Sequence, residues 1–207
     1  MNETVRSYNR DAAAYVEAGA VMPDSVRADI EDFVARLGRG ARVLEIGSGG
    51  GRDAALMEEL GLHVRRTDIT PAFIELLGAQ GHEADLLDPL TDDLASADGG
   101  YDAVWANASL LHVERPDLPV VLTRLTGVTR PGGLLRIAVK EGDGDGWSTH
   151  GSITSPRHFI YWREGPLRAV VADAGWRDVV VDVVPGTKLA ESWLEVAAVC
   201  DRAADGV

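Results

Sequence analysis

The chain alternates between short apolar runs and longer segments in which apolar residues recur every three or four positions. A short apolar run bounded by glycine is typical of a buried strand, whereas spacing of three and four is typical of an amphipathic helix. Residues 26–37 show the helical spacing and stop at Gly38, and the apolar run Val43–Ile46 then ends in a cluster of glycines. The same patterns predict further strands at 62–67, up to Asp85, at 101–106, 134–139, 176–184 and 192–200, and helices at 52–60, 70–80, 118–129 and 164–174.

The order of these elements predicts the fold class. Strands that alternate with helices of this length favour right-handed crossovers and parallel pairing. The last two strands are separated by a short loop containing Pro185 and Gly186, too short for a crossover, so we expect them to pair antiparallel. The chain is therefore predicted to be α/β, with a seven-stranded, mainly parallel sheet, helices on both faces and a C-terminal antiparallel hairpin. We expect one domain over 1–207, with 1–22 as an N-terminal lid or packing helix and 141–162 as a loop region on the substrate side.

Composition narrows the partners that such a domain can have. The 207 residues carry a net charge of −13, which disfavours a large surface for nucleic acid. No stretch approaches the roughly 20 apolar residues of a membrane span, and the N-terminus lacks the apolar core of a signal peptide. Cys200 is the single cysteine, which excludes an intramolecular disulfide and a cysteine-based zinc site. We expect a cytoplasmic protein, a monomer or homodimer, with the residue bias of a GC-rich bacterial coding sequence.

The segment Val43–Gly51, VLEIGSGGG, carries the candidate chemistry. Glycines after a buried strand let the backbone adopt positive φ and let a ligand approach closely. In a dinucleotide fold this loop holds a pyrophosphate, which the carboxylate of Glu45 would repel. Arg52 also stands where a dinucleotide motif has its third glycine. A ligand with an ammonium and a sulfonium suits Glu45 better, and S-adenosylmethionine carries both.

Further motifs follow the glycine loop in a fixed order. An acid, Asp68, follows the second strand, the pair Asp85-Leu86 follows the third, the fourth-strand segment 101–113 reads YDAVWANASLLHV, and 130–133 read RPGG. From about Tyr8 to Val199 the chain resembles the class I S-adenosylmethionine-dependent methyltransferases of small bacterial type, the broad family that includes tellurite-resistance-type methyltransferases. The resemblance implies a Rossmann-like fold and S-adenosyl-L-methionine as the cofactor.

The strand ends supply the expected cofactor contacts. Asp68 lies where a carboxylate can bind both ribose hydroxyls; Thr70 is expected to cap the next helix, although Asp68 itself could serve as that cap. Asp85 can accept from the adenine amino group or be a plain loop acid. By resemblance, Tyr8 or Tyr15 closes a lid that excludes water. The expected cofactor-binding residues are Tyr8, Tyr15, Glu45, Gly47, Ser48, Gly49, Gly51, Asp68, Ile69, Asp85, Leu86, Asn107 and Ala108.

Methyl transfer requires little more of the protein than an in-line nucleophile, with a base only when the acceptor arrives protonated. His112, after the fourth strand, is the candidate general base, with a structural imidazole as the alternative. Residues expected to line the acceptor pocket, or else to be ordinary wall or surface residues, are Lys140, Glu141, His158, Tyr161 and Trp162.

Other features of the sequence bear on a metal site and on alternative functions. Glu141, Asp143 and Asp145 imitate the start of a calcium loop, but Ser152 stands where the bidentate acid is required, so no metal site is predicted. The favoured function is methyl transfer to O, N or S of a small-molecule substrate. The alternatives are the same chemistry on a peptide or protein, and a non-catalytic protein that binds S-adenosylmethionine. An NAD-linked dehydrogenase is disfavoured by Glu45 and Arg52.

Overall fold

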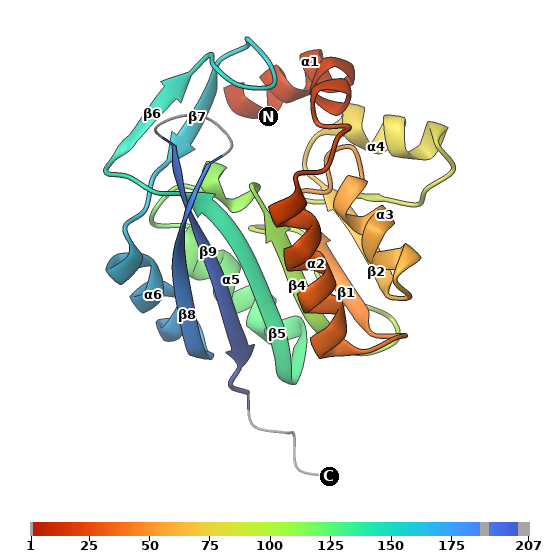
Figure 1. Cartoon of the computed structure of the whole chain (residues 1–207), viewed down its shortest axis with the longest axis vertical. Coiled ribbons are helices and arrows are strands. Elements are labelled where there is room, and N and C mark those ends of the chain that lie inside the picture. Colours follow the sequence, from red (N-terminus) through yellow and green to blue (C-terminus); the bar gives the residue numbers. More distant parts are fainter. Residues whose placement is uncertain (1, 187–190, 203–207) are drawn as a thin grey trace. The chain divides into compact units, whose positions relative to one another are not determined.

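The computed structural model describes residues 2–186 and 191–202 (Figure 1). The strands are β1 (Arg42–Ile46), β2 (His63–Asp68), β3 (Asp85–Leu86), β4 (Tyr101–Asn107), β5 (Thr129–Lys140), β6 (Asp145–Ser148), β7 (Arg157–Ile160), β8 (Trp176–Pro185) and β9 (Ser192–Cys200). The helices are α1 (Glu3–Ala18), α2 (Asp24–Leu37), α3 (Arg52–Glu59), α4 (Pro71–Ala79), the short 3₁₀ helix η1 (Leu110–His112), α5 (Leu118–Val128) and α6 (Glu164–Asp173).

Seven of these strands form the main sheet, in the order β3–β2–β1–β4–β5–β9–β8. β1 pairs parallel with β2, β2 with β3, and β4 with β5. β9 pairs antiparallel with both β5 and β8. This arrangement confirms the predicted fold class, including the C-terminal antiparallel pair; residues 187–190 of the link between β8 and β9 lie outside the described residues.

The described chain divides into two compact units. Unit 1 comprises residues 1–88 and 147–158, and holds β1–β3 with α1–α4. In it, α3 and α4 pack on β2, α2 packs on α3, and α1 packs on α4. Strand β1 is apolar on both faces near its start, as a parallel strand covered by helices requires: Val43 and Leu44 are fully buried.

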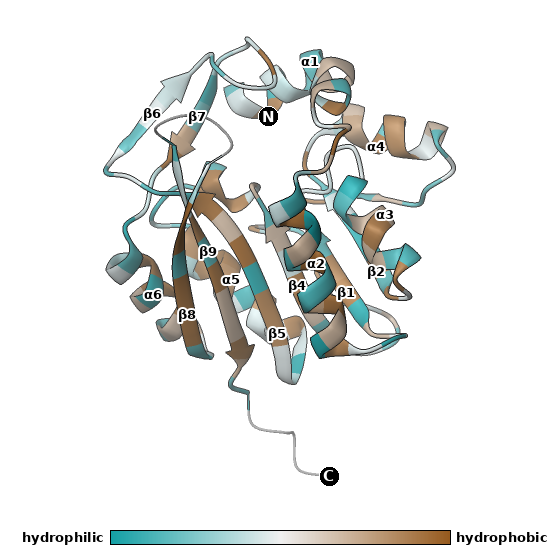
Figure 2. Cartoon of the chain, viewed as in Figure 1, coloured by the Kyte–Doolittle hydropathy of each residue, from teal (hydrophilic) through white to brown (hydrophobic). Residues whose placement is uncertain are grey.

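Unit 2 comprises residues 89–146 and 159–207 as far as they are described, and holds β4, β5, β8 and β9 with α5 and α6. Here α6 packs on β8, and α5 packs on β5 and α6. Hydrophobic residues concentrate on strands β5, β8 and β9 (Figure 2). Trp105 and Trp176 are almost fully buried, and the Trp176 indole N–H donates to the Leu122 carbonyl at 3.2 Å.

Within unit 1, the N-terminal helix is joined to a segment nearly 150 residues away. Ser7 Oγ donates to the Pro156 carbonyl at 2.6 Å, and the His158 N–H donates to Thr4 Oγ1 at 2.9 Å. Arg10 donates to Ser155 Oγ at 2.7 Å. Because Ser7 and Thr4 are buried, these bonds fix α1 to the segment 147–158.

Two boundaries differ from the sequence prediction. The RPGG segment lies inside β5 rather than before it. Tyr101 of β4 pairs with Thr129, but Ala103 pairs with Leu134, so the extra residues of β5 form a bulge where the turn was predicted. The region 141–162, predicted to be a loop region, contains β6 and β7, which pair in a separate two-stranded sheet. The pattern of apolar residues did not predict β6, because this strand has a polar, glycine-containing sequence and buries little apolar surface.

None of the helices in the described ranges is long and apolar enough to cross a membrane.

Candidate functional site

The glycine turn lies at the carboxyl end of β1 in unit 1. Gly49 and Gly51 have φ of +53° and +77°, in the left-handed region that glycine adopts without strain. The N–H groups of Gly47 and Ser48 both donate to the Thr67 carbonyl at 2.9 Å, and the Gly51 N–H donates to the Ser48 carbonyl at 2.8 Å. These bonds tie the turn to β2 and close it immediately before α3 begins.

Glu45 is buried behind this turn, with only 3 % of its surface exposed. Its Oε2 accepts from Ser48 Oγ at 2.5 Å, and the same Ser48 Oγ accepts from the Thr67 N–H at 3.1 Å. Burial raises the pKa of Glu45 to about 8, although the bond from Ser48 opposes the shift. The sequence predicts an ionised carboxylate here, whereas at neutral pH burial favours the protonated acid, since ionisation would leave a buried charge.

Raising the pH from about 5 to about 8 is expected to destabilise the protein relative to a Glu45→Gln variant. In this window the unfolded carboxyl is ionised while the folded one keeps its proton, so the folded state binds more protons and its stability falls. The loss is about 1.4 kcal/mol per pH unit at its steepest and levels off above pH 8. Chemical denaturation of both proteins across this range measures the difference; identical slopes would contradict the assignment.

Asp68, at the carboxyl end of β2, faces the glycine turn. Its Oδ2 accepts from the Gly49 N–H at 2.9 Å and its Oδ1 accepts from the Thr70 N–H at 2.8 Å. Burial raises the pKa of Asp68, and the backbone bond from Gly49 opposes the shift. Thr70 is the N-cap residue of α4, with a proline in the first turn, as expected, although its side chain makes no cap bond.

Two apolar side chains next to Asp68, those of Ile69 and Leu86, are exposed to solvent instead of being packed in the core. Ile69 follows β2 and Leu86 ends β3, and 58 % of Leu86 is exposed. Asp85, beside Leu86, accepts from Arg65 Nε at 2.7 Å. The ion pair gives Asp85 a structural partner, while its half-exposed carboxylate also remains open to solvent.

Helix α1 covers the glycine turn with aromatic side chains. The rings of Tyr8 and Tyr15 stack edge-to-face with centroids 5.3 Å apart, and the Tyr15 ring lies 5.4 Å from that of Phe73 in α4. A Cβ placed on Gly49 would lie 3.4 Å from Tyr15 Cε1. Burial raises the pKa of both tyrosines. The helix therefore packs on the glycine turn. This position is the one expected both of a packing helix and of a lid that has closed.

In unit 2, the carboxyl end of β4 carries a strained residue. Ala108 has φ of +55°, which is uncommon for a residue with a Cβ, and its N–H donates to the Ala138 carbonyl at 3.0 Å. Asn107 ends β4 just before it, and His112 lies in η1 just after it. The His112 ring lies 4.8 Å from the Phe159 ring, centroid to centroid. A strained turn followed by a half-buried imidazole is typical of a site rather than of a simple connection.

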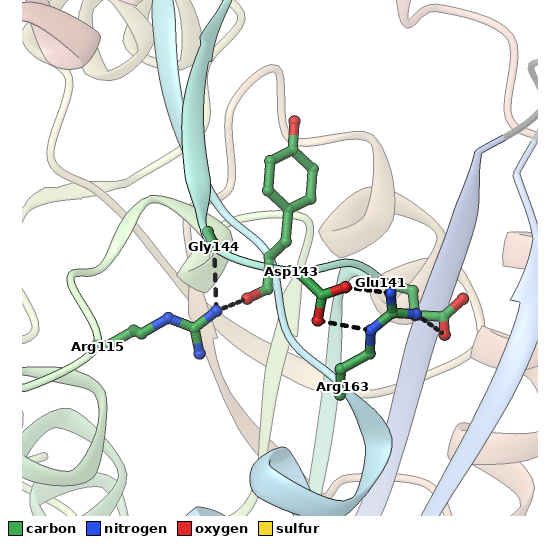
Figure 3. A network of polar contacts seen from close by, with 6 residues as sticks. Arg115, Glu141, Asp143, Gly144 and Arg163 are labelled. Carbon is green, nitrogen blue, oxygen red and sulfur yellow. Dashed lines mark hydrogen bonds and ion pairs between the residues drawn. The ribbon is translucent and has the colours of Figure 1, made fainter.

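The segment after β5 is held by two arginines, which Figure 3 shows. Arg163 donates to Glu141 at 3.0 Å and to Asp143 at 2.9 and 2.5 Å, and this pairing lowers the pKa of Asp143. Arg115 donates to the carbonyls of Gly144 and Tyr161. Two of the three acids that imitate a calcium loop, Glu141 and Asp143, are thus paired with Arg163. In the described ranges no group of three or more acids, histidines or cysteines is placed to hold a metal.

The expected acceptor residues fall into different environments. Trp162 is buried, with the Arg115 guanidinium 4.6 Å from its ring, so it packs as core in this structure. Glu141 is held in the arginine network, whereas Lys140 lies over aromatic rings. His158 belongs to unit 1, where its ring lies 5.1 Å from that of Trp147.

Several residues of these sites were missed from the sequence. Phe73 and Arg157 contact the tyrosines of α1 in unit 1, and Phe159 and Trp193 lie beneath Lys140 in unit 2. The aromatic and β-branched residues Phe159 and Ile160 favour a strand and could have located Phe159 in one. Arg157 and Phe73 carry no comparable signal, because their partners are distant in sequence.

The residues of unit 1 fit an adenosine-bearing cofactor. The glycine turn admits close backbone approach, the Asp68 carboxylate offers acceptor oxygens beside it, and the exposed Ile69 and Leu86 present an apolar surface. The fold is of the open α/β class, in which ligands bind at the carboxyl ends of the strands, where these residues lie.

Comparison with known proteins narrows the class. Residues 44–137 match the methyltransferase domain family. The chain is 33 % identical over 106 residues to Methyltransferase GfsG of Streptomyces halstedii, covering 48 % of this chain and 37 % of that protein. It is 32 % identical over 101 residues to the ubiquinone biosynthesis O-methyltransferase of Xanthomonas oryzae pv. oryzae, covering 46 % and 41 %. The matches thus span less than half the length of these relatives.

Solved structures share the fold over nearly the whole chain. The 1,6-didemethyltoxoflavin-N1-methyltransferase of Burkholderia thailandensis, solved with 1,6-didemethyltoxoflavin and S-adenosylhomocysteine, superposes with a TM-score of 0.64 at 24 % identity, covering 95 % of this chain and 82 % of that one. The CcbJ methyltransferase of Streptomyces caelestis superposes with a TM-score of 0.72 at 17 % identity, covering 97 % and 100 %. The chain therefore has the fold of solved S-adenosylmethionine-dependent methyltransferases, and its residues 44–137 match the methyltransferase domain family.

Proposed function

We propose that this protein is an enzyme that methylates an O, N or S atom of a small-molecule acceptor. When bound, S-adenosylmethionine supplies a methyl group on a positively charged sulfur; transfer breaks the carbon–sulfur bond, forms the bond to the acceptor atom and leaves S-adenosylhomocysteine. The observation that carries the proposal is the assembly in unit 1 of the glycine turn, the Asp68 carboxylate and the exposed pair Ile69 and Leu86.

The chain's own residues have defined tasks in this proposal. Asp68 binds the ribose hydroxyls, and Ile69 and Leu86 cover the adenine ring. Glu45 and the glycine turn hold the methionine end, where an ammonium would favour the ionised form of the Glu45 carboxyl. Tyr8 and Tyr15 exclude water, because their rings already pack over the turn. Asn107 and Ala108 are proposed to contact the cofactor through their backbone.

Small-molecule acceptors are supported by the relatives. One is named for ubiquinone biosynthesis, and one structural neighbour was solved with 1,6-didemethyltoxoflavin. The net charge of −13 also disfavours an acidic macromolecule as acceptor. We propose that the acceptor is surrounded by Lys140, Glu141, His158, Tyr161 and Trp162. Of these, Lys140 is the best candidate for direct contact, because its ammonium lies over two aromatic rings.

His112→Ala is expected to lower turnover by about 10²-fold without weakening S-adenosylhomocysteine binding. The reason is that a positioned general base typically contributes 10²–10⁴-fold when the acceptor arrives protonated. Steady-state kinetics together with calorimetric binding separates the two effects. His63→Ala, at the exposed start of β2, is the matched control. Unchanged turnover in His112→Ala would leave His112 a structural residue.

A methyl-transfer screen tests the proposal as a whole. The protein is incubated with S-adenosylmethionine carrying a labelled methyl group and with panels of phenols, amines, thiols and peptides. Label in small-molecule products supports the proposal. Label in peptides alone would favour a peptide or protein acceptor, and tight cofactor binding without any transfer would favour a non-catalytic binding protein.

A further inference from the structure

The ammonium of Lys140 lies in an aromatic environment within unit 2. Its Nζ is 4.8 Å from the centroid of the Phe159 ring and 5.6 Å from that of the Trp193 ring. Only 17 % of the Lys140 side chain is exposed. Lysine normally keeps its head group in water, so an ammonium turned onto two ring faces at a strand end is a specific arrangement rather than a solvated surface charge.

The fold places these groups together through register and strand direction. Lys140 is the last residue of β5, and its partner in the antiparallel pairing with β9 is Trp193. Phe159 is supplied by β7. The cluster therefore lies at the carboxyl end of β5, the edge at which open α/β sheets bind their ligands.

The Phe159 ring also links the ammonium to a proton acceptor. The His112 ring lies 4.8 Å from it, with 47° between the planes. A neutral imidazole can take a proton near pH 7, and an ammonium stabilises an oxyanion. A cation, a base and two aromatic surfaces are the groups that an acidic aromatic hydroxyl would need.

A structural role for Lys140 has to be weighed against this. Its Nζ is 3.1 Å from Glu191 Oε1, and this ion pair satisfies the charge. However, 36 % of the Glu191 side chain is exposed, and an ion pair with a partner in water contributes little to stability. A ligand oxyanion that also stacks on Phe159 and Trp193 can displace the Glu191 carboxylate at small cost.

We infer that Lys140, Phe159 and Trp193, with His112, form the acceptor subsite for a planar aromatic molecule bearing an acidic hydroxyl, which binds as its anion. The inference rests on the proposed function and names its substrate class. The hydroxyl proton passes to His112 and then to solvent. The oxygen forms its bond to the methyl carbon as the carbon–sulfur bond breaks, with that electron pair remaining on sulfur, so the oxyanion and sulfonium charges both vanish.

An equilibrium titration tests this without turnover. The protein is saturated with S-adenosylhomocysteine and titrated with 4-nitrophenol, whose ionised form absorbs in the visible. We expect wild type to bind the ionised form and to lower the apparent pKa of the bound probe. Lys140→Met is expected to weaken binding by about tenfold and to abolish the spectral shift, whereas Lys140→Arg keeps the charge and part of the affinity.

Controls separate this inference from the proposed function. Arg177→Met removes an exposed cation of unit 2 that pairs with Asp178, and should change nothing. Glu191→Gln removes the competing carboxylate and should tighten binding; weaker binding would contradict its displacement. Equal affinity for 4-nitroanisole, which cannot ionise, or unchanged binding in Lys140→Met would overturn the inference while S-adenosylhomocysteine still binds. Failure to bind S-adenosylhomocysteine would instead refute the proposed function.

Discussion

Asp68→Asn is expected to weaken the binding of S-adenosylhomocysteine by about 10²–10³-fold. A carboxylate that accepts from two ribose hydroxyls makes two charge-assisted hydrogen bonds, each contributing roughly 1.5–3 kcal/mol. The amide replaces one acceptor oxygen with a donor. That donor would face either the ribose or the Gly49 N–H, which now donates to Asp68 at 2.9 Å. Calorimetric titration of wild type and variant measures the loss.

The matched control for this experiment is Asp32→Asn, on the exposed side of α2 in the same unit. It removes the same charge far from any strand end, so its affinity for S-adenosylhomocysteine should equal that of wild type. Thermal unfolding of Asp68→Asn establishes that the variant is folded. Affinity within threefold of wild type in a folded Asp68→Asn would show that Asp68 serves only to hold the backbone of Gly49 and Thr70.

Gly51→Ala is expected to destabilise the protein by about 2–5 kcal/mol and to impair cofactor binding in whatever fraction folds. Gly51 has φ of +77°, which costs an alanine about 1–2 kcal/mol. A Cβ there would also lie 2.5 Å from Cδ2 of Leu77, which is fully buried in α4, so the Leu77 side chain would have to shift within the core. Overpacking of this kind adds about 1–3 kcal/mol. Denaturant unfolding measures the sum.

Gly78→Ala provides the comparison within the same unit. Gly78 is in α4, next to Leu77, and a Cβ there would meet nothing within 4 Å. The alanine should therefore stabilise the helix by up to about 1 kcal/mol. If both substitutions had the same effect, the conformation assigned to the glycine turn would be wrong.

Local pattern accounts for the parts of this fold that sequence could predict. The glycine turn after Val43–Ile46 combines a buried strand with residues that tolerate positive φ, and both properties are carried by neighbouring positions. The antiparallel pairing of the last two strands followed from the length of their link. Strand ends could likewise be assigned to Asp68 and Lys140, because the apolar runs stop there.

Contacts between distant segments account for what sequence did not predict. Lys140 could be assigned to a strand end, but nothing in its neighbourhood indicated that Phe159 and Trp193 would lie beneath its ammonium. The ionisation of Glu45 was misjudged for a similar reason. Its pKa is set mainly by burial, which depends on how the turn, β2 and α3 close around it rather than on its own segment.

The measurement that tests the central claim most directly is a calorimetric titration of the whole chain with S-adenosylhomocysteine and, separately, with NAD. The glycine turn, Asp68 and the exposed apolar pair predict micromolar affinity for S-adenosylhomocysteine, equivalent to roughly −8 kcal/mol, and no measurable heat with NAD. Tighter binding of NAD, or no binding of S-adenosylhomocysteine, would contradict the account.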